Sequence, residues 1–263
     1  MARATAIKLV AGVLVAVEAM CLRAEGRALA IVLTLLAMFA FFAHVIASPR
    51  SQFLVRSTHR LPTTETNAVA FTFDDGPDPA TTPRVLELLA AHDARATFFV
   101  VGSRAAAHPD IVRRIVEEGH EVGSHTYRHS NAFHFMTPSA MRAEVERGIA
   151  AVAAVTGSAP RLFRPPQGLR TPFLRDALSP LEELVCVTWT ARGLDTMGLS
   201  ASAILRRLES EVCAGAILTL HDGAGLGGTS DRRPTIEALE RLLEIARERG
   251  LRCVSLAALA GQA

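Results

Sequence analysis

The sequence predicts an α/β fold in which parallel strands alternate with helices, preceded by one or two apolar N-terminal segments. Seven short runs of apolar, β-branched and aromatic residues are separated by stretches with helical periodicity. Such alternation is typical of βα units, which either close into a barrel or form an open doubly wound sheet. The 263 residues can bury a substantial core, and the net charge of +2 argues against a nucleic-acid-binding protein.

The N-terminal part, residues 1–47, is apolar enough to enter a membrane. Residues 28–47 form an uncharged run of twenty residues, which at about 1.5 Å per residue spans the hydrocarbon layer of a bilayer. Residues 6–22 are also apolar but contain Lys8 and Glu18, so this stretch forms either a second span or an interfacial helix. Arginines flank both segments, so the positive-inside rule does not decide the orientation.

A polar stretch with two prolines, residues 48–67, is interpreted as a linker. Beyond it, apolar and β-branched runs next to turn residues predict strands at 68–73, 96–101, 121–124, 162–163, 184–189, 216–220 and 251–256. Helical periodicity predicts helices at 82–92, 109–118, 138–156, 201–212 and 235–249. The third and fifth of these helices end at Gly157 and Gly250, because glycine readily takes the left-handed conformation that terminates a helix.

Polar residues with catalytic chemistry stand where the predicted strands end. Asp74 and Asp75 end the first strand and precede Gly76-Pro77. Adjacent carboxylates point in different directions, so one can bind a metal while the other acts as a base. The same residues are also common turn formers, and on their own they fit either role.

A histidine pair follows the third strand. His125 and His129 are four residues apart, a spacing that places two imidazoles on one side of a helical turn and suits a divalent metal. Two surface histidines in a loop are the alternative. With an aspartate from a neighbouring strand they would form a three-ligand site with open positions for water and substrate, as in catalytic metal centres. The nearby His120 and His134 are interpreted as bystanders.

Two further residues stand at strand ends. His221 emerges from an apolar strand, where it is either a general acid or a core histidine bonded to a neighbour. Arg164 precedes Pro165-Pro166, and a guanidinium fixed by this rigid turn can orient a carboxylate, although a lone arginine is more often structural.

Taken together, the motifs TFDDGP, HTYRH, RPPQG and LTLHDG, in this order, resemble the polysaccharide deacetylase family (NodB homology domain, carbohydrate esterase family 4). The resemblance covers roughly residues 68–256. It implies an irregular (β/α)7 barrel and metal-dependent hydrolysis of an N-acetyl group on an aminosugar. Asp75, His125 and His129 match the metal ligands of the family, usually for zinc, with cobalt, nickel or manganese as alternatives.

The resemblance also implies catalytic roles. Asp74 matches the base that takes a proton from water, and Arg164 matches the residue that holds this base. His221 matches the acid that protonates the leaving amine. The substrate-binding positions implied in the same way are Leu220, at the wall of the acetyl pocket, Gln167, whose backbone N–H would bind the oxyanion, and Trp189.

Two positions depart from the family pattern. Gln167 stands where an aromatic residue is usual. The fourth motif has Arg192 at its first aspartate and Thr196 at its final tryptophan, and only Asp195 fits. The carboxylate that tunes His221 is therefore either Asp195 or Asp222.

The predicted protein is a membrane-anchored deacetylase with its catalytic domain at residues 68–263. The resemblance favours the bacterial inner membrane, with this domain on the extracytoplasmic side. Only 5% of the residues are aromatic, so a long aromatic groove is not expected, and the substrate is predicted to be a short or lipid-linked saccharide. The alternatives are a deformylase or other amidohydrolase acting on a glycan intermediate, and a non-catalytic saccharide-binding protein of the membrane.

Overall fold

The computed structural model describes residues 11–12, 14–16, 24–62, 67–224 and 231–260, which divide into two units at Ser48 and Pro49. In the first unit, helix α2 runs from Ala24 to Ala47. Its residues Ala28–Ala47 are long and apolar enough to cross a membrane, and the same length and composition would suit a signal sequence. Most of the second candidate span, residues 6–22, lies outside the described residues.

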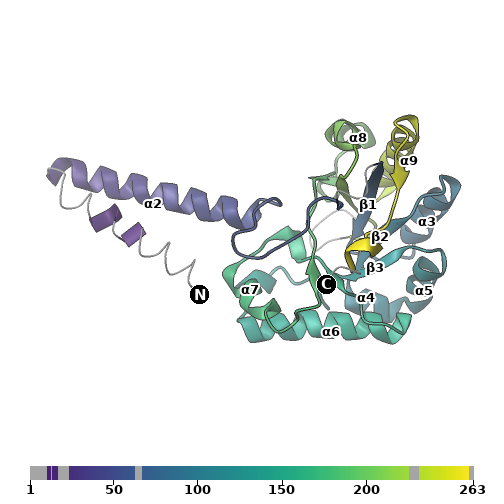
Figure 1. Ribbon diagram of the computed structural model, residues 1–263, viewed down its shortest axis with the longest axis horizontal. Coiled ribbons are helices and arrows are strands. Elements are labelled where there is room, and N and C mark those ends of the chain that lie inside the picture. The colour runs from purple at the N-terminus through teal and green to yellow at the C-terminus, as the bar shows by residue number, and fades with distance from the viewer. Residues whose placement is uncertain (1–10, 13, 17–23, 63–66, 225–230, 261–263) are drawn as a thin grey trace. The chain divides into compact units, whose positions relative to one another are not determined.

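The second unit is built on a parallel sheet that forms a half barrel (Figure 1). Its strands are β1 (Ala68–Asp74), β2 (Ala96–Val100), β3 (Glu121–Ser124), β4 (Leu162–Phe163), β5 (Val185–Cys186), β6 (Ala191–Arg192), β7 (Ile217–His221) and β8 (Arg252–Cys253). The strand order is β5-β4-β3-β2-β1-β7-β6, and β8 pairs with the start of β1. The parallel α/β prediction is confirmed, with the sheet open between β5 and β6 in the described part of the chain.

The region predicted as one strand, 184–189, pairs only at the β4 side of the sheet, and the next residue, Thr190, bonds to the other side. Val187 N–H donates to Phe163 O beside β4, whereas Thr190 N–H donates to Ile217 O at the start of β7. The chain therefore changes partner within three residues. This crossing shortens the predicted strand to β5 and creates β6, which the sequence pattern did not predict.

Residues 49–62, called the strap below, lie across this opening. Thr58 forms a parallel bridge with Val187, and Arg60 forms an antiparallel bridge with Ala216. The hydroxyl of Thr190 also donates to His59 O at 2.8 Å. The described part of the expected linker, 48–67, thus contributes backbone contacts to both edges of the sheet.

Helices cover the outside of the half barrel (Figure 1). They are α3 (Thr82–Ala91), α4 (Gly102–Ala107), α5 (Pro109–Glu117), α6 (Pro138–Thr156), α7 (Pro172–Leu178), α8 (Ala201–Leu208), α9 (Arg233–Glu248) and α10 (Ala257–Ala260). Thr137, Thr171 and Ser200 cap α6, α7 and α8, since each side chain accepts a backbone N–H of the first turn. The short helices α4 and α7 were not predicted, because neither is long enough to show clear periodicity.

The core lies between the sheet and these helices. Phe71, Phe73 and Phe98 are fully buried there, and the rings of Phe73 and Phe98 stack with their centroids 5.0 Å apart. Because all the strand pairs are parallel, the carboxyl ends of the strands meet at one end of the sheet. The loops that follow the strands therefore share one face, called the catalytic face below.

Candidate active site

Three potential metal ligands converge on the catalytic face. Asp75 Oδ1 lies 3.6 Å from His125 Nε2 and 3.3 Å from His129 Nε2. All three side chains are buried, and their ligating atoms lie within 4.8 Å of one another. Asp75 and His129 have left-handed backbones, with φ of 72° and 52°, a conformation that is uncommon outside glycine. The fold thus holds these ligands in place through loop geometry as well as through side-chain packing.

The chemistry of the three side chains fits a divalent cation. Asp75 Oδ1 is buried and accepts no hydrogen bond from the described residues. His125 Nδ1 lies 2.6 Å from Arg164 O, so a proton on this nitrogen leaves the Nε2 lone pair available for a metal. Burial, assisted by His125, lowers the pKa of His129 to about 4, so its imidazole is neutral. A carboxylate oxygen without a donor, beside the neutral imidazole of His129 and the Nε2 atom of His125, suits a divalent cation.

Asp74, the neighbour of Asp75, is held by a buried arginine. Arg164 Nη1 lies 2.7 Å from Asp74 Oδ1 and 2.8 Å from Thr72 Oγ1, and Arg164 Nη2 donates to Thr188 O at 2.9 Å. Burial alone would raise the pKa of Asp74, but the guanidinium of Arg164 holds it below its ordinary value. Asp74 is therefore an ionised carboxylate that is fixed in orientation.

The carboxylate partner of His221 is Asp195. His221 Nδ1 lies 2.8 Å from Asp195 Oδ1, and the backbone N–H of His221 donates to Asp195 Oδ2 at 2.9 Å. Thr235 Oγ1 also donates to Asp195 Oδ2, at 3.0 Å. Burial disfavours the imidazolium, but the Asp195 carboxylate and the hydrogen bond to it raise the pKa of His221 to about 9.

The other carboxylate considered, Asp222, faces a different element. Its Oδ2 accepts a hydrogen bond from Thr82 Oγ1, in α3, at 2.6 Å. Burial raises the pKa of Asp222 to about 7. Of the two alternatives left by the sequence, the structure places Asp195 against His221 and Asp222 against α3.

The register of the sheet sets Asp74 opposite His221. The β1–β7 ladder pairs Asp74 with His221 across the two strand ends, one residue before the Asp75 ligand. Burial and hydrogen bonds thus place an ionised carboxylate and a protonated imidazole side by side. Such opposed protonation states in neighbouring groups are typical of an acid–base pair.

The substrate-binding candidates lie around this pair. Leu220 is fully buried in β7, and Trp189 is almost buried against Gly168, where an added Cβ would overlap its ring. Gln167 is exposed, with φ of 51°. Its Oε1 lies 3.1 Å from Nε2 of His134, which was expected to be a bystander.

Two supporting residues were missed by sequence reasoning. Arg104, in α4, donates to the backbone carbonyls of Asp75 and Ala224 and so ties the loop after β1 to the loop after β7. Arg232 Nη1 donates to Asp195 O at 3.1 Å. Neither belongs to a motif, and only the three-dimensional contacts identify them.

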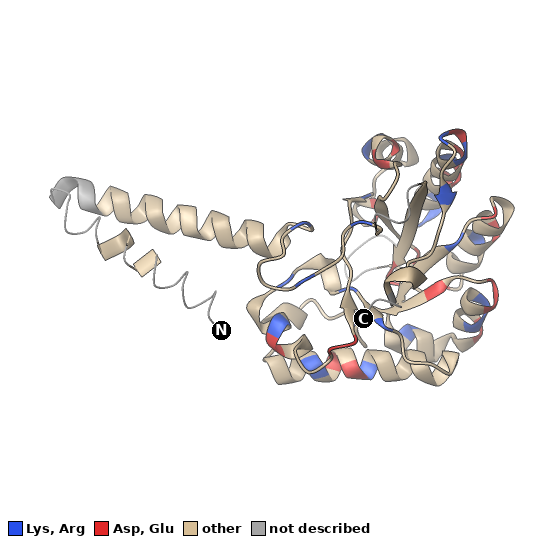
Figure 2. Ribbon diagram, in the orientation of Figure 1, with Lys and Arg blue, Asp and Glu red and all other residues tan. Residues whose placement is uncertain are grey.

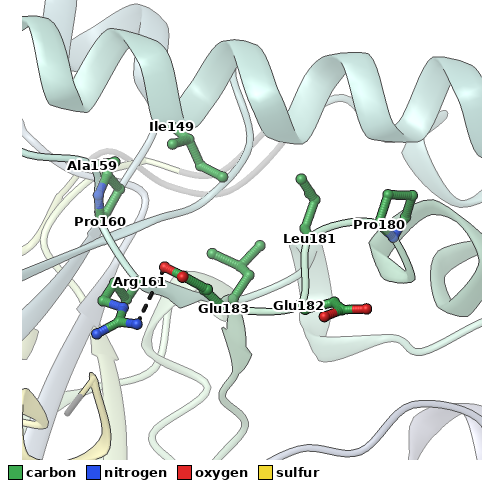
Figure 3. A pocket seen from close by; sticks show the side chains of 9 residues that line it. Ile149, Ala159, Pro160, Arg161, Pro180, Leu181, Glu182 and Glu183 are labelled. Carbon is green, nitrogen blue, oxygen red and sulfur yellow. Dashed lines mark hydrogen bonds and ion pairs between the residues drawn. The ribbon is translucent and has the colours of Figure 1, made fainter. Parts of the chain in front are cut away.

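A separate cavity of about 540 Å³ lies between α6 and the segment that leads into β5 (Figure 3). Its polar side chains include Arg161 and Glu183, which form an ion pair of 3.2 Å. It contains no potential metal ligand from the three-residue cluster and no member of the acid–base pair. The candidate catalytic and metal-binding residues therefore lie on the catalytic face and not in this cavity.

Comparison with known proteins agrees with this geometry. The model of the family described as polysaccharide deacetylase matches residues 62–182. A peptidoglycan-N-acetylglucosamine deacetylase from Bacillus cereus is 32% identical over 72% of this chain and 66% of its own length. A chitooligosaccharide deacetylase from Bradyrhizobium is 35% identical over 70% of this chain and 87% of its own length.

A solved structure shares the fold. The Bc1960 peptidoglycan N-acetylglucosamine deacetylase, in complex with 4-naphthalen-1-yl-N-oxidanyl-benzamide, aligns with a TM-score of 0.70 at 28% identity. The alignment covers 84% of this chain and 95% of that one. With the Bradyrhizobium relative matched over most of its length, these similarities show that the chain belongs to the polysaccharide deacetylase family of hydrolases.

Proposed function

We propose that this protein removes the N-acetyl group from an aminosugar of a bacterial cell-envelope saccharide, with a divalent metal, zinc, held by Asp75, His125 and His129. The observation that carries the proposal is the pairing of Asp74 and His221 in opposite protonation states beside these ligands. The names of the relatives, which include deacetylases of peptidoglycan and of chitooligosaccharides, support the same substrate class.

Asp74 is the base in this proposal. Arg164 occupies Asp74 Oδ1, so Asp74 Oδ2 accepts the proton of the attacking water. The bond to Arg164 keeps the carboxylate ionised and prevents it from rotating. Positioning and ionisation together are the requirements for a general base.

His221 is the acid. Because its Nδ1 is bonded to Asp195, the proton that it donates is on Nε2. Donation to the amide nitrogen lets the sugar leave as a neutral amine. Asp195 stabilises the imidazolium before the transfer and orients the ring during it.

The remaining groups bind the acyl part. When bound, the metal supplies Lewis acidity toward the amide carbonyl and toward the attacking water. The backbone N–H of Gln167 donates to the developing oxyanion, an interaction worth about 3–4 kcal/mol in other hydrolases. Leu220 and Trp189 enclose the acetyl methyl group. The ligand of the Bc1960 structure is an N-hydroxybenzamide, a chelating group, which supports a metal at this kind of site.

The location is part of the proposal. Residues 28–47 anchor the chain in the inner membrane, and the catalytic domain, residues 68–263, faces the extracytoplasmic side. The hydropathy and length of this part of α2 support a span.

Acetate release by the purified full-length chain tests the proposal. With a soluble N-acetylglucosamine oligomer as substrate, a chelator should abolish release and added zinc should restore it. Asp74→Asn should keep its metal and lose at least about 100-fold in kcat, because no group accepts the proton. Asp176→Asn is the matched control, since Asp176 is exposed and its carboxylate contacts Arg175.

Two further measurements test whether His221 is the acid and whether the acyl group removed is acetyl. His221→Ala should impair hydrolysis of the natural amide more than that of an acetyl ester with a good leaving group, which needs no proton. Equal losses on both substrates would contradict the role of His221. Release of formate from N-formyl sugars without release of acetate would favour the deformylase alternative over the proposal.

A further inference from the structure

The strap joins the apolar helix to the catalytic unit with almost no spare chain. Only Ser48 separates the end of α2 from Pro49, whose carbonyl oxygen accepts a hydrogen bond of 2.9 Å from Thr188 Oγ1. The carbonyl of Thr188 in turn accepts from Arg164, the residue that holds Asp74. The catalytic unit therefore begins one residue after the end of α2.

The strap continues along a loop of the catalytic face. Arg170 Nη1 donates to Ser51 O at 2.5 Å and to Ser57 Oγ at 2.6 Å. Arg170 lies in the β4–α7 loop, between Gln167 and Phe173. The chain thus enters the catalytic unit on the side where the substrate-binding loops lie.

Exposed apolar side chains follow three of the strands at the catalytic face. Among the described residues after the strap, the large apolar side chains that are exposed are Val116, Phe135, Phe173 and Met197. The last three, called the apolar rim, follow the carboxyl ends of β3, β4 and β6. Val116 lies in α5, whose end leads into the start of β3, at the opposite end of the sheet.

Two residues of the apolar rim are close in sequence to residues of the candidate site. Phe135 is 88% exposed and follows His134, which contacts Gln167. Met197 is 72% exposed and lies two residues after Asp195, the partner of His221. The exposed side chains of Phe135 and Met197 thus belong to the same chain segments as residues of the candidate site.

The strap adds positive charge. Arg50 and Arg56 are exposed, whereas the exposed Arg60 lies beside the start of β7, at the opposite end of the sheet. The described strap contains no acidic residue (Figure 2). A basic side chain near an anionic leaflet is attracted to it. A basic segment beside exposed apolar side chains is typical of protein surfaces that lie in the membrane interface.

From these observations we propose that the catalytic face works against the bilayer and that the substrate is an aminosugar carried on a membrane lipid, with the apolar rim in contact with the lipid surface. The inference rests on the proposed function and names its substrate class. A groove for a long soluble glycan would present flat aromatic rings in a row. Here the rim combines two phenylalanines with a methionine from three separate segments that follow strands, one of them the start of α7.

Two substrates with the same reacting group separate lipid contact from glycan contact. The full-length chain is placed in vesicles of phosphatidylglycerol and phosphatidylethanolamine. It is given either N-acetylglucosamine linked through diphosphate to a polyprenol or the soluble N-acetylglucosamine tetramer. The double variant Phe135→Ser/Met197→Ser should lose at least about tenfold in kcat/KM on the lipid-linked substrate and less than about twofold on the tetramer. Val116→Ser is the matched control and should change neither value.

A change in the connection provides an independent measurement. Twenty Gly and Ser residues inserted between Ser48 and Pro49 give a flexible chain of about 25 Å that frees the catalytic unit from the surface. The insertion should slow turnover of the lipid-linked substrate several-fold and leave the tetramer unaffected. Equal losses on both substrates, or faster turnover of the tetramer by the unchanged protein, would overturn the inference. Absence of acetate from both substrates would overturn the proposed function itself.

Discussion

Replacement of Asp195 by Asn removes the charge that holds His221 protonated while keeping a side chain of the same shape. Asp195 touches His221 twice, through Nδ1 at 2.8 Å and through the backbone N–H at 2.9 Å. An amide oxygen can still accept from the backbone, so the strand end should keep its place. The expected change is therefore electrostatic and concerns the pKa of His221.

The size of the effect follows from the two protonation states. Burial is opposed by Asp195, and the pKa of His221 is raised to about 9. At about pH 8, roughly nine tenths of such an imidazole is protonated, whereas at its ordinary pKa of about 6.5 only about 3% is. The variant should therefore lose about 30-fold in kcat/KM at this pH. Burial, no longer opposed, would increase the loss further.

The assay is the pH dependence of kcat/KM for acetate release, with metal content measured on the same samples. In the natural protein activity should fall as pH rises through about 9, and in the variant it should fall at about 6.5 or below. Thr235→Val is the control, because it removes one hydrogen bond to Asp195 and keeps its charge. A variant that keeps its metal and still loses activity only near pH 9 would refute the reasoning.

Three further changes test the site and its support. His125→Ala should bring metal content from about one ion per chain to near zero, because two ligands hold zinc poorly; unchanged content by elemental analysis would contradict the ligand assignment. Gly168→Ala should cost at least about 2 kcal/mol more in unfolding free energy than Gly157→Ala. Both glycines have positive φ, but only at Gly168 does an added Cβ meet Trp189; equal costs in urea unfolding would contradict the packing argument. Asp222 holds a proton in the native state up to about pH 7, so stability falls as pH rises from about 4 to about 7. Asp222→Asn should lack this fall and be more stable by roughly 1–4 kcal/mol at pH 8 than the natural protein, with little difference at pH 4. If the unfolding free energies of the two proteins change with pH in parallel, Asp222 does not hold this proton.

The elements that the sequence predicted well are those whose pattern is local. The strands at 121–124 and 162–163 and the helix at 138–156 have the predicted bounds, since burial and capping leave direct marks on the residues concerned. The segment 184–189 was mispredicted because the chain pairs with β4 up to Val187 and with β7 from Thr190, and both partners are distant in sequence. No local pattern records that a chain leaves one sheet edge for the other.

The candidate site likewise has a part that the local sequence predicts and a part that depends on distant contacts. Asp74, His125 and His221 were proposed as site residues because each stands where a predicted strand ends, and the structure places each of them at the end of a strand or directly after it. The choice between Asp195 and Asp222 could not be made from the sequence. It depends on how the loop after β6 folds back onto β7, a contact of 2.8 Å between residues 26 positions apart.

Backbone conformation explains why part of the site leaves no mark in the sequence. The described non-glycine residues with positive φ are Asp75, Asp93, Thr126, His129, Gln167 and Leu194. All but Asp93 lie in the loops that carry the site, and two are proposed metal ligands. Such conformations cost of order 1–3 kcal/mol each and persist only where the surrounding fold imposes them. Sequence patterns would place glycine or asparagine at these positions. Here the residue types are set by chemistry, so the loops that hold the ligands are the least predictable part of the backbone.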